Sequence, residues 1–458
     1  KTILSEVNSV VGKGLGSMMN LFMQGAIILA LLTLLIFVNL KLTLIVGLTL
    51  GLAYLIIYKF SQFYITRIGQ ERFKANQTRF TAVSEAFGAA KEIKVGGLEK
   101  IYIKRFSDPA KVLAQSNASM AVLTLIPRFA LEAITFGGML LVVLYLMMLS
   151  GNLTTALPII ALYAFAGYRL MPALQGIYVS VSQLRYISPS IDSMYDDVMK
   201  LQPSISNKNQ DPLMLKKNIV LKNINYHYPN VKRTTLKDIN LEIPANSTVG
   251  LVGATGSGKT TTVDIILGLL EAQKGSLEVD GKVIDKNNRR AWQHSIGYVP
   301  QHIFLADDTV SANIAFGINP KDVNQEAVEE AAKIANLHEF VINELPSKYK
   351  TTVGERGIRL SGGQRQRIGI ARALYHKPQV LILDEATSAL DNLTEKIVME
   401  AVHNIGKNIT IIMIAHRLST VKNCDIIFQL ENGILKDQGT FDKLIEINDK
   451  FRENVSKN

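Results

Sequence analysis

The sequence predicts an all-α transmembrane domain followed by an α/β domain that carries a phosphate-binding loop. Two observations lead to this fold class: four long apolar runs occupy the first half, and a glycine-rich loop in the second half lies between a strand-like and a helix-like run. The chain has 458 residues, of which 48% are hydrophobic. This length suggests two or three domains, and this composition excludes an intrinsically disordered chain.

The four apolar runs are candidates for membrane-spanning helices, which need about 20 residues. They form two pairs, and only three residues separate the runs within each pair. We therefore expect two tight transmembrane hairpins. The runs are Leu21–Val38, Leu42–Tyr58, Ala133–Leu149 and Leu153–Gly167.

The stretch between the hairpins is basic and polar. Residues 59–118 contain 11 Lys/Arg, whereas the hairpin tips contain only Lys41. The positive-inside rule places this stretch in the cytoplasm and favours a membrane protein over a nucleic-acid binder. We expect residues 61–95 to form a helix of about 50 Å, a break at Gly96 and Gly97, and a return helix that begins at Leu98. The single cysteine, Cys424, excludes an internal disulfide.

The linker-like composition of Leu201–Pro212 marks a domain boundary. We expect the membrane domain to cover residues 1–205. Beyond the linker, strand-like and helix-like runs alternate, which indicates an α/β domain over residues 206–458.

A GxxxxGK[ST] loop follows the strand-like run Thr248–Val252 and precedes the helix-like run Thr261–Leu270. In this context the glycines let backbone N–H groups approach phosphate oxygens, and the helix N-terminus favours negative charge. We expect Lys259 to reach the β- and γ-phosphates and Thr260 to hold Mg²⁺. The predicted nucleotide contacts in this segment are Gly253, Thr255, Gly256, Ser257, Gly258, Lys259, Thr260 and Thr261.

Two carboxylates follow a second apolar strand. The run Val380–Leu383 ends at Asp384 and Glu385. A buried parallel strand would carry Asp384 to the magnesium ion and Glu385 to the attacking water. A third segment, Leu360–Gln364 (LSGGQ), precedes a helical run and offers another anion cradle at a helix N-terminus.

With these motifs in this order, residues 213–458 resemble an ATP-binding cassette (ABC) domain, and LSGGQ resembles its signature motif. The resemblance implies that ATP and Mg²⁺ are bound. It assigns Tyr228 to adenine stacking, Gln301 and His416 to catalysis beside Glu385, and Thr260, Gln301 and Asp384 to Mg²⁺. It assigns Ser388–Asp391 to the loop that crosses to the partner, and Thr352–Gly357 resembles a short exporter motif. The long spacing from Lys259 to Asp384 leaves room for an inserted helical subdomain near Asp322–Arg372.

The resemblance also implies a dimer. In this family, the signature loop of one cassette closes over nucleotide held by the other. The residues that would do so here are Ser361, Gly362, Gly363 and Gln364. Because no motif residue is degenerate, we expect a homodimer with two competent sites. Glu385 would orient the water that attacks the γ-phosphate.

Membrane helices followed by one cassette resemble an ABC exporter half-transporter, which has six transmembrane helices. Four are visible here, so we expect two more before Lys1, with the chain in a bacterial inner membrane and the cassette in the cytoplasm. Glu92–Glu99 resembles a coupling segment that docks into the opposite cassette; a solvated helix break is the alternative. The apolar runs argue against the soluble ABC ATPases, and we expect no nucleic-acid partner.

Charged residues inside membrane segments point to substrate. Arg128 and Glu132 lie one helical turn apart, and Arg169 lies in the fourth apolar segment. Arginine suits phosphate or pyrophosphate. Alternatively, Arg128 and Glu132 only pair along the helix, and Arg169 reaches the inner interface.

The PR-x-x-LE and YRLMP runs resemble those of bacterial lipid-linked oligosaccharide flippases. That resemblance implies ATP-driven flipping of a lipid-linked glycan. The alternative is export of another amphipathic substrate, such as a lipid A-like lipid, a peptide or a drug.

Overall fold

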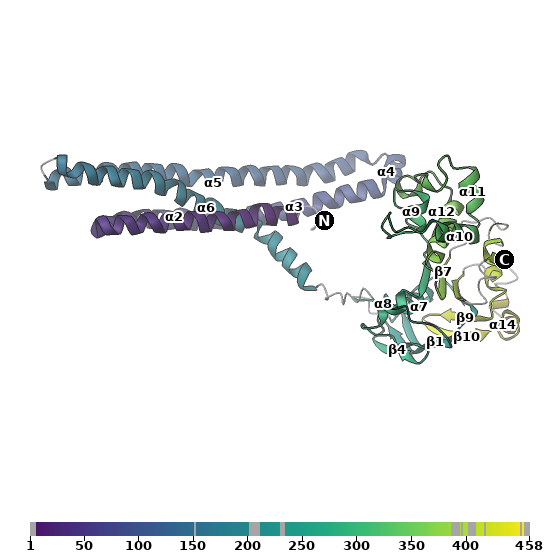
Figure 1. Ribbon diagram of the computed structural model, residues 1–458. Coiled ribbons are helices and arrows are strands. Elements are labelled where there is room, and N and C mark those ends of the chain that lie inside the picture. The colour runs from purple at the N-terminus through teal and green to yellow at the C-terminus, as the bar shows by residue number, and fades with distance from the viewer. Residues whose placement is uncertain are drawn as a thin grey trace. The chain divides into compact units, whose positions relative to one another are not determined.

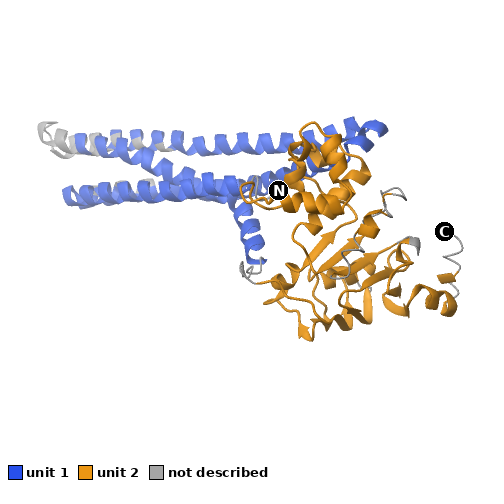
Figure 2. Cartoon of the chain, turned by 45° about the vertical axis from the view of Figure 1, so that its right-hand side comes forward, with its two compact units in different colours: residues 1–204 blue, residues 205–458 orange. Residues whose placement is uncertain are grey.

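The computed structural model forms two compact units, residues 1–204 and residues 205–458 (Figure 2). The described residues are 6–150, 153–200, 211–229, 234–385, 394, 397–401, 409–415, 418–448 and 451–452.

The first unit consists of four long helices that run alongside one another (Figure 1). Each contains one of the four predicted apolar runs, and only Asn39, in an extended conformation, separates the first two helices. A π-helical segment and two short helices complete the unit. The elements are α1 (Val7–Ser9), η2 (Val10–Leu15), α2 (Gly16–Val38), α3 (Leu40–Gly88), α4 (Ala90–Gly96), α5 (Glu99–Ser150) and α6 (Leu153–Lys200).

Two helical stretches within the described residues are long and apolar enough to cross a membrane, Val7–Val38 and Glu99–Gly138. Large apolar side chains of α2 point outward, for example Phe22 (77% exposed) and Phe37 (86% exposed). An exposed apolar surface of this kind is typical of a lipid or partner interface. The third predicted run, Ala133–Leu149, extends beyond the second stretch, which ends at Gly138. Spans by the second, third and fourth apolar runs remain predictions.

The turn between α3 and α5 differs from the predicted helix over residues 61–95. The helix already breaks at Ala89 (φ −111°, ψ 35°), directly after Gly88, and α4 is a separate short helix. Gly97 then adopts a left-handed conformation (φ 63°) and ends α4, as expected for a glycine after a helix C-terminus. The break at Ala89 was not predicted because neither neighbour is proline and alanine favours a helix.

Helices α3 and α6 approach each other closely at Gly69. A Cβ atom at Gly69 would lie 2.6 Å from the carbonyl oxygen of Tyr186, so the two backbones touch there. A small apolar core surrounds this crossing. Its buried members are Ile65, Ile68, Met120, Tyr186 and Ile187.

The second unit contains two sheets. The larger has the strand order β10-β9-β3-β8-β7-β6, and all its pairings are parallel except β10 with β9. The smaller is antiparallel, with the order β2-β1-β4-β5. The strands are β1 (Asn218–Tyr226), β2 (Leu236–Pro244), β3 (Thr248–Val252), β4 (Lys274–Val279), β5 (Lys282–Val283), β6 (Ile296–Val299), β7 (Val380–Asp384), β8 (Thr410–Ile414), β9 (Ile426–Glu431) and β10 (Ile434–Gly439).

The central strands β3, β7 and β8 are buried along their whole length. This burial explains their continuous apolar sequences, because strands covered on both faces do not alternate. Ile414 of β8 pairs with Leu251 of β3 on one side and with Asp384 of β7 on the other. The carboxyl ends of β3 and β7 therefore lie at one edge of the sheet, where ligands bind in parallel α/β sheets.

Helices cover the sheets and build the predicted subdomain. Within residues 322–372, α10 and α12 begin at side-chain caps formed by Asn324 and Ser361. The described helices are α7 (Lys259–Ile266), α8 (Arg289–Gln293), α9 (Val310–Ile314), α10 (Gln325–Ile334), α11 (His338–Asn343), η3 (Lys348–Lys350), η4 (Glu355–Gly357), α12 (Gly362–Leu374), η6 (Leu418–Val421) and α14 (Phe441–Ile447).

Candidate nucleotide-binding site

The glycine-rich loop joins β3 to α7 and needs glycine for both conformation and space. Gly253, Gly256 and Gly258 have φ values of 150°, 78° and 104°. A Cβ atom added at Gly253 would lie 2.2 Å from the carbonyl oxygen of Leu430. A Cβ atom added at Gly258 would lie 2.6 Å from a side-chain carbon of Leu236. Glycine at these positions therefore allows the loop to fold back tightly.

Lys259 forms the cationic centre of this loop. Its side chain is buried (5% exposed), and its Nζ donates hydrogen bonds to the carbonyl oxygens of Gly253 (2.7 Å) and Ala254 (3.1 Å). Burial lowers the pKa of Lys259, and the charges of Glu385 and Asp384 oppose this shift. A buried ammonium held against a glycine loop is a ready site for phosphate oxygens.

The hydroxyls of the loop fit the same ligand. Among the described residues, no hydrogen-bond partner is found for the buried Oγ of Ser257. Thr260 and Thr255 are exposed at the loop surface, whereas Thr261 is buried. A phosphate group placed on this loop would supply the acceptor that the Ser257 hydroxyl lacks.

The two carboxylates at the end of β7 have different surroundings. Asp384 is buried (6% exposed) and accepts a long hydrogen bond of 3.4 Å from the Tyr298 hydroxyl. Burial raises the pKa of Asp384, and the neighbouring charge of Glu385 raises it further. Glu385 adopts a left-handed conformation (φ 49°) and accepts a hydrogen bond of 2.8 Å from Nε2 of Gln301.

The structure thus brings Gln301, Asp384 and Glu385 together. Hydroxyl, carboxylate and amide oxygens are the ligands that Mg²⁺ prefers. Thr260, Asp384 and Gln301 supply one of each. The raised pKa of Asp384 also indicates a carboxylate that a nearby cation would stabilise. These residues fit a nucleotide-bound magnesium ion.

Tyr228 lies beside the start of α7. Its hydroxyl is 3.2 Å from Oγ1 of Thr261, and its ring makes an edge contact with Tyr226 at a centroid distance of 5.2 Å. The side chain is 38% exposed. An aromatic ring held near the phosphate loop and open to solvent is suited to stacking on a base.

Sequence reasoning missed Tyr298 and Asp264. Tyr298 in β6 pairs with Ile382 in the neighbouring strand β7 and so reaches Asp384. Burial raises the pKa of Asp264, and its charge contributes to the raised pKa of both Asp384 and Tyr298. The sheet order places Tyr298 beside Asp384, whereas Asp264 lies on α7. Neither residue belongs to a motif with fixed spacing.

The signature segment forms its own helix cap. Ser361 precedes α12, its Oγ accepts a hydrogen bond from the backbone N–H of Gln364 (3.2 Å), and its own N–H donates to Oε1 of Gln364 (2.8 Å). Ser361 is exposed, and Gly362 and Gly363 form the first turn. The segment is therefore a preformed helix N-terminus open to a ligand or partner.

Other predicted residues lie elsewhere. His416 and Ser388–Asp391 fall outside the described residues. Arg128 on α5 pairs with Glu132 (Nε to Oε1, 2.9 Å), and their side chains are 53% and 31% exposed. Arg169 on α6 is exposed.

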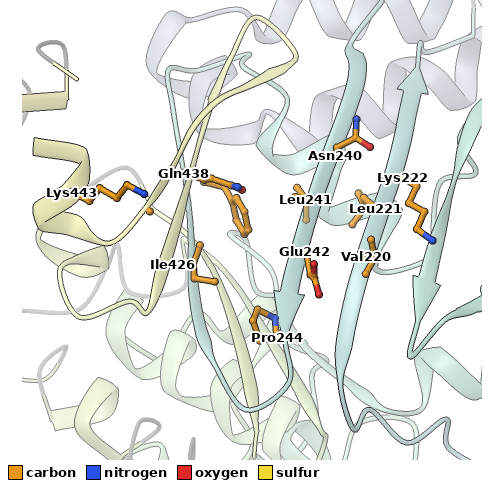
Figure 3. A pocket seen from close by; sticks show the side chains of 12 residues that line it. Val220, Leu221, Lys222, Asn240, Leu241, Glu242, Pro244, Ile426, Gln438 and Lys443 are labelled. Carbon is orange, nitrogen blue, oxygen red and sulfur yellow. The ribbon is translucent and has the colours of Figure 1, made fainter. Parts of the chain in front are cut away.

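A separate groove of about 600 Å³ lies in the second unit. Strands β1, β2, β9 and β10 line it, and Lys443 of α14 reaches its rim (Figure 3). None of the predicted nucleotide contacts lines this groove. Its position does not support a role in nucleotide binding.

Comparison with known proteins places these motifs in a family. Residues 236–388 match the ABC transporter family. Over 456 residues the chain is 31% identical to the ATP-dependent lipid A-core flippase of Cupriavidus metallidurans, covering 97% of the chain and 74% of the flippase. The chain belongs to the ABC exporters. Like other exporters of the half-transporter type, it joins a helical domain to one ATP-hydrolysing cassette.

Two further similarities agree with this assignment. The exporter superposes on a solved structure of a bacterial Atm1-family ABC exporter with ATP bound, with a TM-score of 0.86 at 24% identity, covering 99% of the chain and 80% of that structure. It is also 40% identical over 272 residues to ABC transporter B family member 15 of Arabidopsis thaliana, covering 58% of the chain and 22% of that protein. The predicted fold class is thereby confirmed.

Proposed function

We propose that this exporter uses ATP to move a lipid with a large polar head group out of the cytoplasmic leaflet of a bacterial inner membrane. The observation that carries the proposal is the similarity to a lipid A-core flippase over 97% of the chain. A lipid-linked oligosaccharide is the leading substrate, because of the PR-x-x-LE and YRLMP runs. A lipid A-like lipid is the second candidate, favoured by the name of that relative.

The cassette geometry supports the following roles. Lys259 and the loop N–H groups bind the phosphates of ATP, while Tyr228 stacks on adenine. Thr260, Gln301 and Asp384 hold Mg²⁺, which neutralises phosphate charge when bound. Glu385, held by Gln301, orients the attacking water. The family resemblance, and not the geometry, assigns His416 to the γ-phosphate, because His416 lies outside the described residues.

The second copy of the chain completes each site in this proposal. The exposed helix N-terminus at Ser361, Gly362, Gly363 and Gln364 would close over the nucleotide bound by the partner. Its N–H groups favour the negative charge of the transferred phosphoryl group. The assembly is a homodimer, with both cassettes in the cytoplasm.

In the membrane domain, Arg128, Glu132 and Arg169 are the proposed substrate contacts. Arg169 is better suited than Arg128 to bind an anionic head group, because Arg128 is already paired with Glu132. An arginine that contacts pyrophosphate should be needed for lipid movement and not for basal ATP hydrolysis.

The test uses the purified protein in proteoliposomes. ATP-dependent movement of a labelled isoprenyl-pyrophosphate oligosaccharide is compared with that of a lipid A-type lipid in wild type, Glu385→Gln and Arg169→Ala. Arg67→Ala, on an exposed pair of α3, is the control. We expect lipid movement to be lost in Glu385→Gln, to weaken in Arg169→Ala and to stay unchanged in Arg67→Ala. ATP hydrolysis with neither lipid moved would overturn the substrate proposal.

A further inference from the structure

A buried cluster of charged and polar side chains joins three segments of the helical unit. Glu6 precedes α1, Arg72 and Asn76 lie on α3, and Ser190 lies on α6. Their exposed fractions are 4%, 4%, 7% and 0%. Neither ATP chemistry nor the proposed substrate contacts use these residues.

The contacts in this cluster are direct. Nη2 of Arg72 lies 3.1 Å from Oε2 of Glu6 and donates a 2.6 Å hydrogen bond to Oγ of Ser190. Nδ2 of Asn76 donates to Oε1 of Glu6 at 2.7 Å, and the Ser190 hydroxyl also donates to Glu6. Glu6 is therefore bound through both carboxylate oxygens, by side chains from two helices.

The cluster lies away from the hydrocarbon part of a membrane. Counting ~1.5 Å per helical residue from the tip at Asn39, Glu6 and Arg72 are each about 50 Å away. A hydrocarbon core is about 30 Å thick, so both residues lie roughly 20 Å beyond it. Protein, and not lipid, buries them, and water can reach them when the helices separate.

Stability alone does not explain this cluster. Removing two charges from water offsets much of their attraction, and apolar replacements of buried ion pairs are often as stable. The Nε of Arg72 is also buried, with no hydrogen-bond partner in the part of the chain that is described. A partly satisfied buried pair favours a role in selecting between two arrangements.

The surroundings of the cluster suit such a role. One turn before Arg72, Gly69 allows α3 to touch the backbone of α6 at Tyr186. Directly after Glu6 and α1, Val10–Leu15 forms a π-helix, a feature often found at functional sites. All three segments thus meet at a close and irregular junction.

We infer that Glu6, Arg72, Asn76 and Ser190 form a latch that holds the N-terminal segment against α3 and α6 in one of the two arrangements of the transport cycle. The inference rests on the proposed transport function, because a transporter must present its cargo site to each side in turn. The latch residues are positioning residues. They are buried and paired in the arrangement described here, and hydrated when α3 separates from α6.

The test measures the separation of α3 and α6 in the full protein in nanodiscs. Spin labels replace Gln77 and Asp192, which are exposed on α3 and α6, in a Cys424→Ala background. Glu6→Gln leaves Arg72 buried without its anion, so we expect the separated population without nucleotide to rise about tenfold. The Glu6→Gln/Arg72→Gln double variant should show a smaller rise, because no buried charge is left unpaired.

Two controls keep the result interpretable. Glu71→Gln breaks the exposed Arg67–Glu71 pair of the same helix, whose side chains are 66% and 48% exposed, and should leave the distances unchanged. Ser190→Ala removes hydrogen bonds without unpairing a charge and should shift the distances in the same direction as Glu6→Gln, by less. It replaces Glu6→Gln if that variant does not fold.

The outcomes separate the latch from the transport proposal. If wild type neither hydrolyses ATP nor moves lipid, the proposed function fails. If wild type does both but Glu6→Gln and Ser190→Ala behave like Glu71→Gln, the latch is wrong. A distance distribution that is identical with and without ATP in an active wild type would also overturn it.

Discussion

Two aspartates at the ends of cassette strands, Asp384 and Asp280, show how local contacts decide a pKa. Burial, together with the charge of Glu385, raises the pKa of Asp384. Burial would also raise the pKa of Asp280, but the backbone N–H groups of Lys216, Lys217 and Asn218 outweigh it and lower that pKa. The first aspartate opposes folding when it is ionised, whereas the second supports folding.

The two aspartates should therefore respond oppositely to replacement by asparagine. Because the folded-state pKa of Asp384 is raised, its ionised form lowers stability above that pKa, so Asp384→Asn should raise Tm by a few degrees at pH 7 and by less near pH 4. Because the folded-state pKa of Asp280 is lowered, its stabilising effect is full above about pH 4 and is lost as pH falls through the folded-state pKa. Asp280→Asn should lower Tm at pH 7.

The measurement is thermal unfolding followed by the fluorescence of Trp292. This single tryptophan is fully buried in the cassette, so it reports on that unit within the intact protein. Shifts of the same sign for both variants would contradict the conclusion that ionised Asp384 opposes folding.

At the scale of elements, the phosphate loop offers a matched pair of glycines. Gly256 and Gly258 both have positive φ. A Cβ atom added at Gly256 would meet nothing within 4 Å, whereas one added at Gly258 would lie 2.6 Å from Leu236. The two positions therefore separate backbone strain from steric exclusion.

We expect Gly258→Ala to weaken nucleotide binding at least tenfold and to lower cassette stability, because either the loop or the fully buried Leu236 side chain must shift. Gly256→Ala adds only the strain of positive φ, about 1 kcal/mol, and should have the milder effect. Titration with a fluorescent ATP analogue checks both variants. Equal losses would show that backbone conformation alone controls the loop.

Elements with a uniform environment could be predicted from the sequence. The strands Thr248–Val252 and Val380–Asp384 lie at their predicted positions, because burial on both faces requires an apolar run with sharp ends. The approach of Tyr298 to Asp384, the break at Ala89 and the Glu6–Arg72 pair were not predicted. Each depends on which segments become neighbours, and short-range sequence patterns do not carry that information.

At the scale of the whole molecule, the exposed cap at Ser361 bears on the predicted homodimer. If each ATP site combines Lys259 of one chain with Ser361 of the other, the distribution of two lesions between the subunits decides the activity. Ser361→Arg with Lys259→Ala in one subunit disables both composite sites. The same lesions in opposite subunits leave one site intact.

We therefore expect mixed dimers with lesions in opposite subunits to keep up to half of wild-type ATPase activity, and dimers with both lesions in one subunit to fall to background. The reverse order would mean that each chain hydrolyses ATP by itself. Asn324→Ala controls for the lost cap, because Asn324 caps α10 as Ser361 caps α12. A cap is worth about 1 kcal/mol, so this control should alter stability but not turnover.

The two longest helices have a mechanical consequence. With 49 and 52 residues, α3 and α5 are each more than 70 Å long, at about 1.5 Å per residue. A rod of that length that tilts by about 5° displaces its far end by about 6 Å, which exceeds the pitch of a helical turn. A slight rotation at the α4 end then moves the opposite ends of the two helices by more than one helical turn. Helices α3 and α5 can thus act as a pair of lever arms. The angle through which the turn at α4 rotates then matters more than the distance that the turn moves.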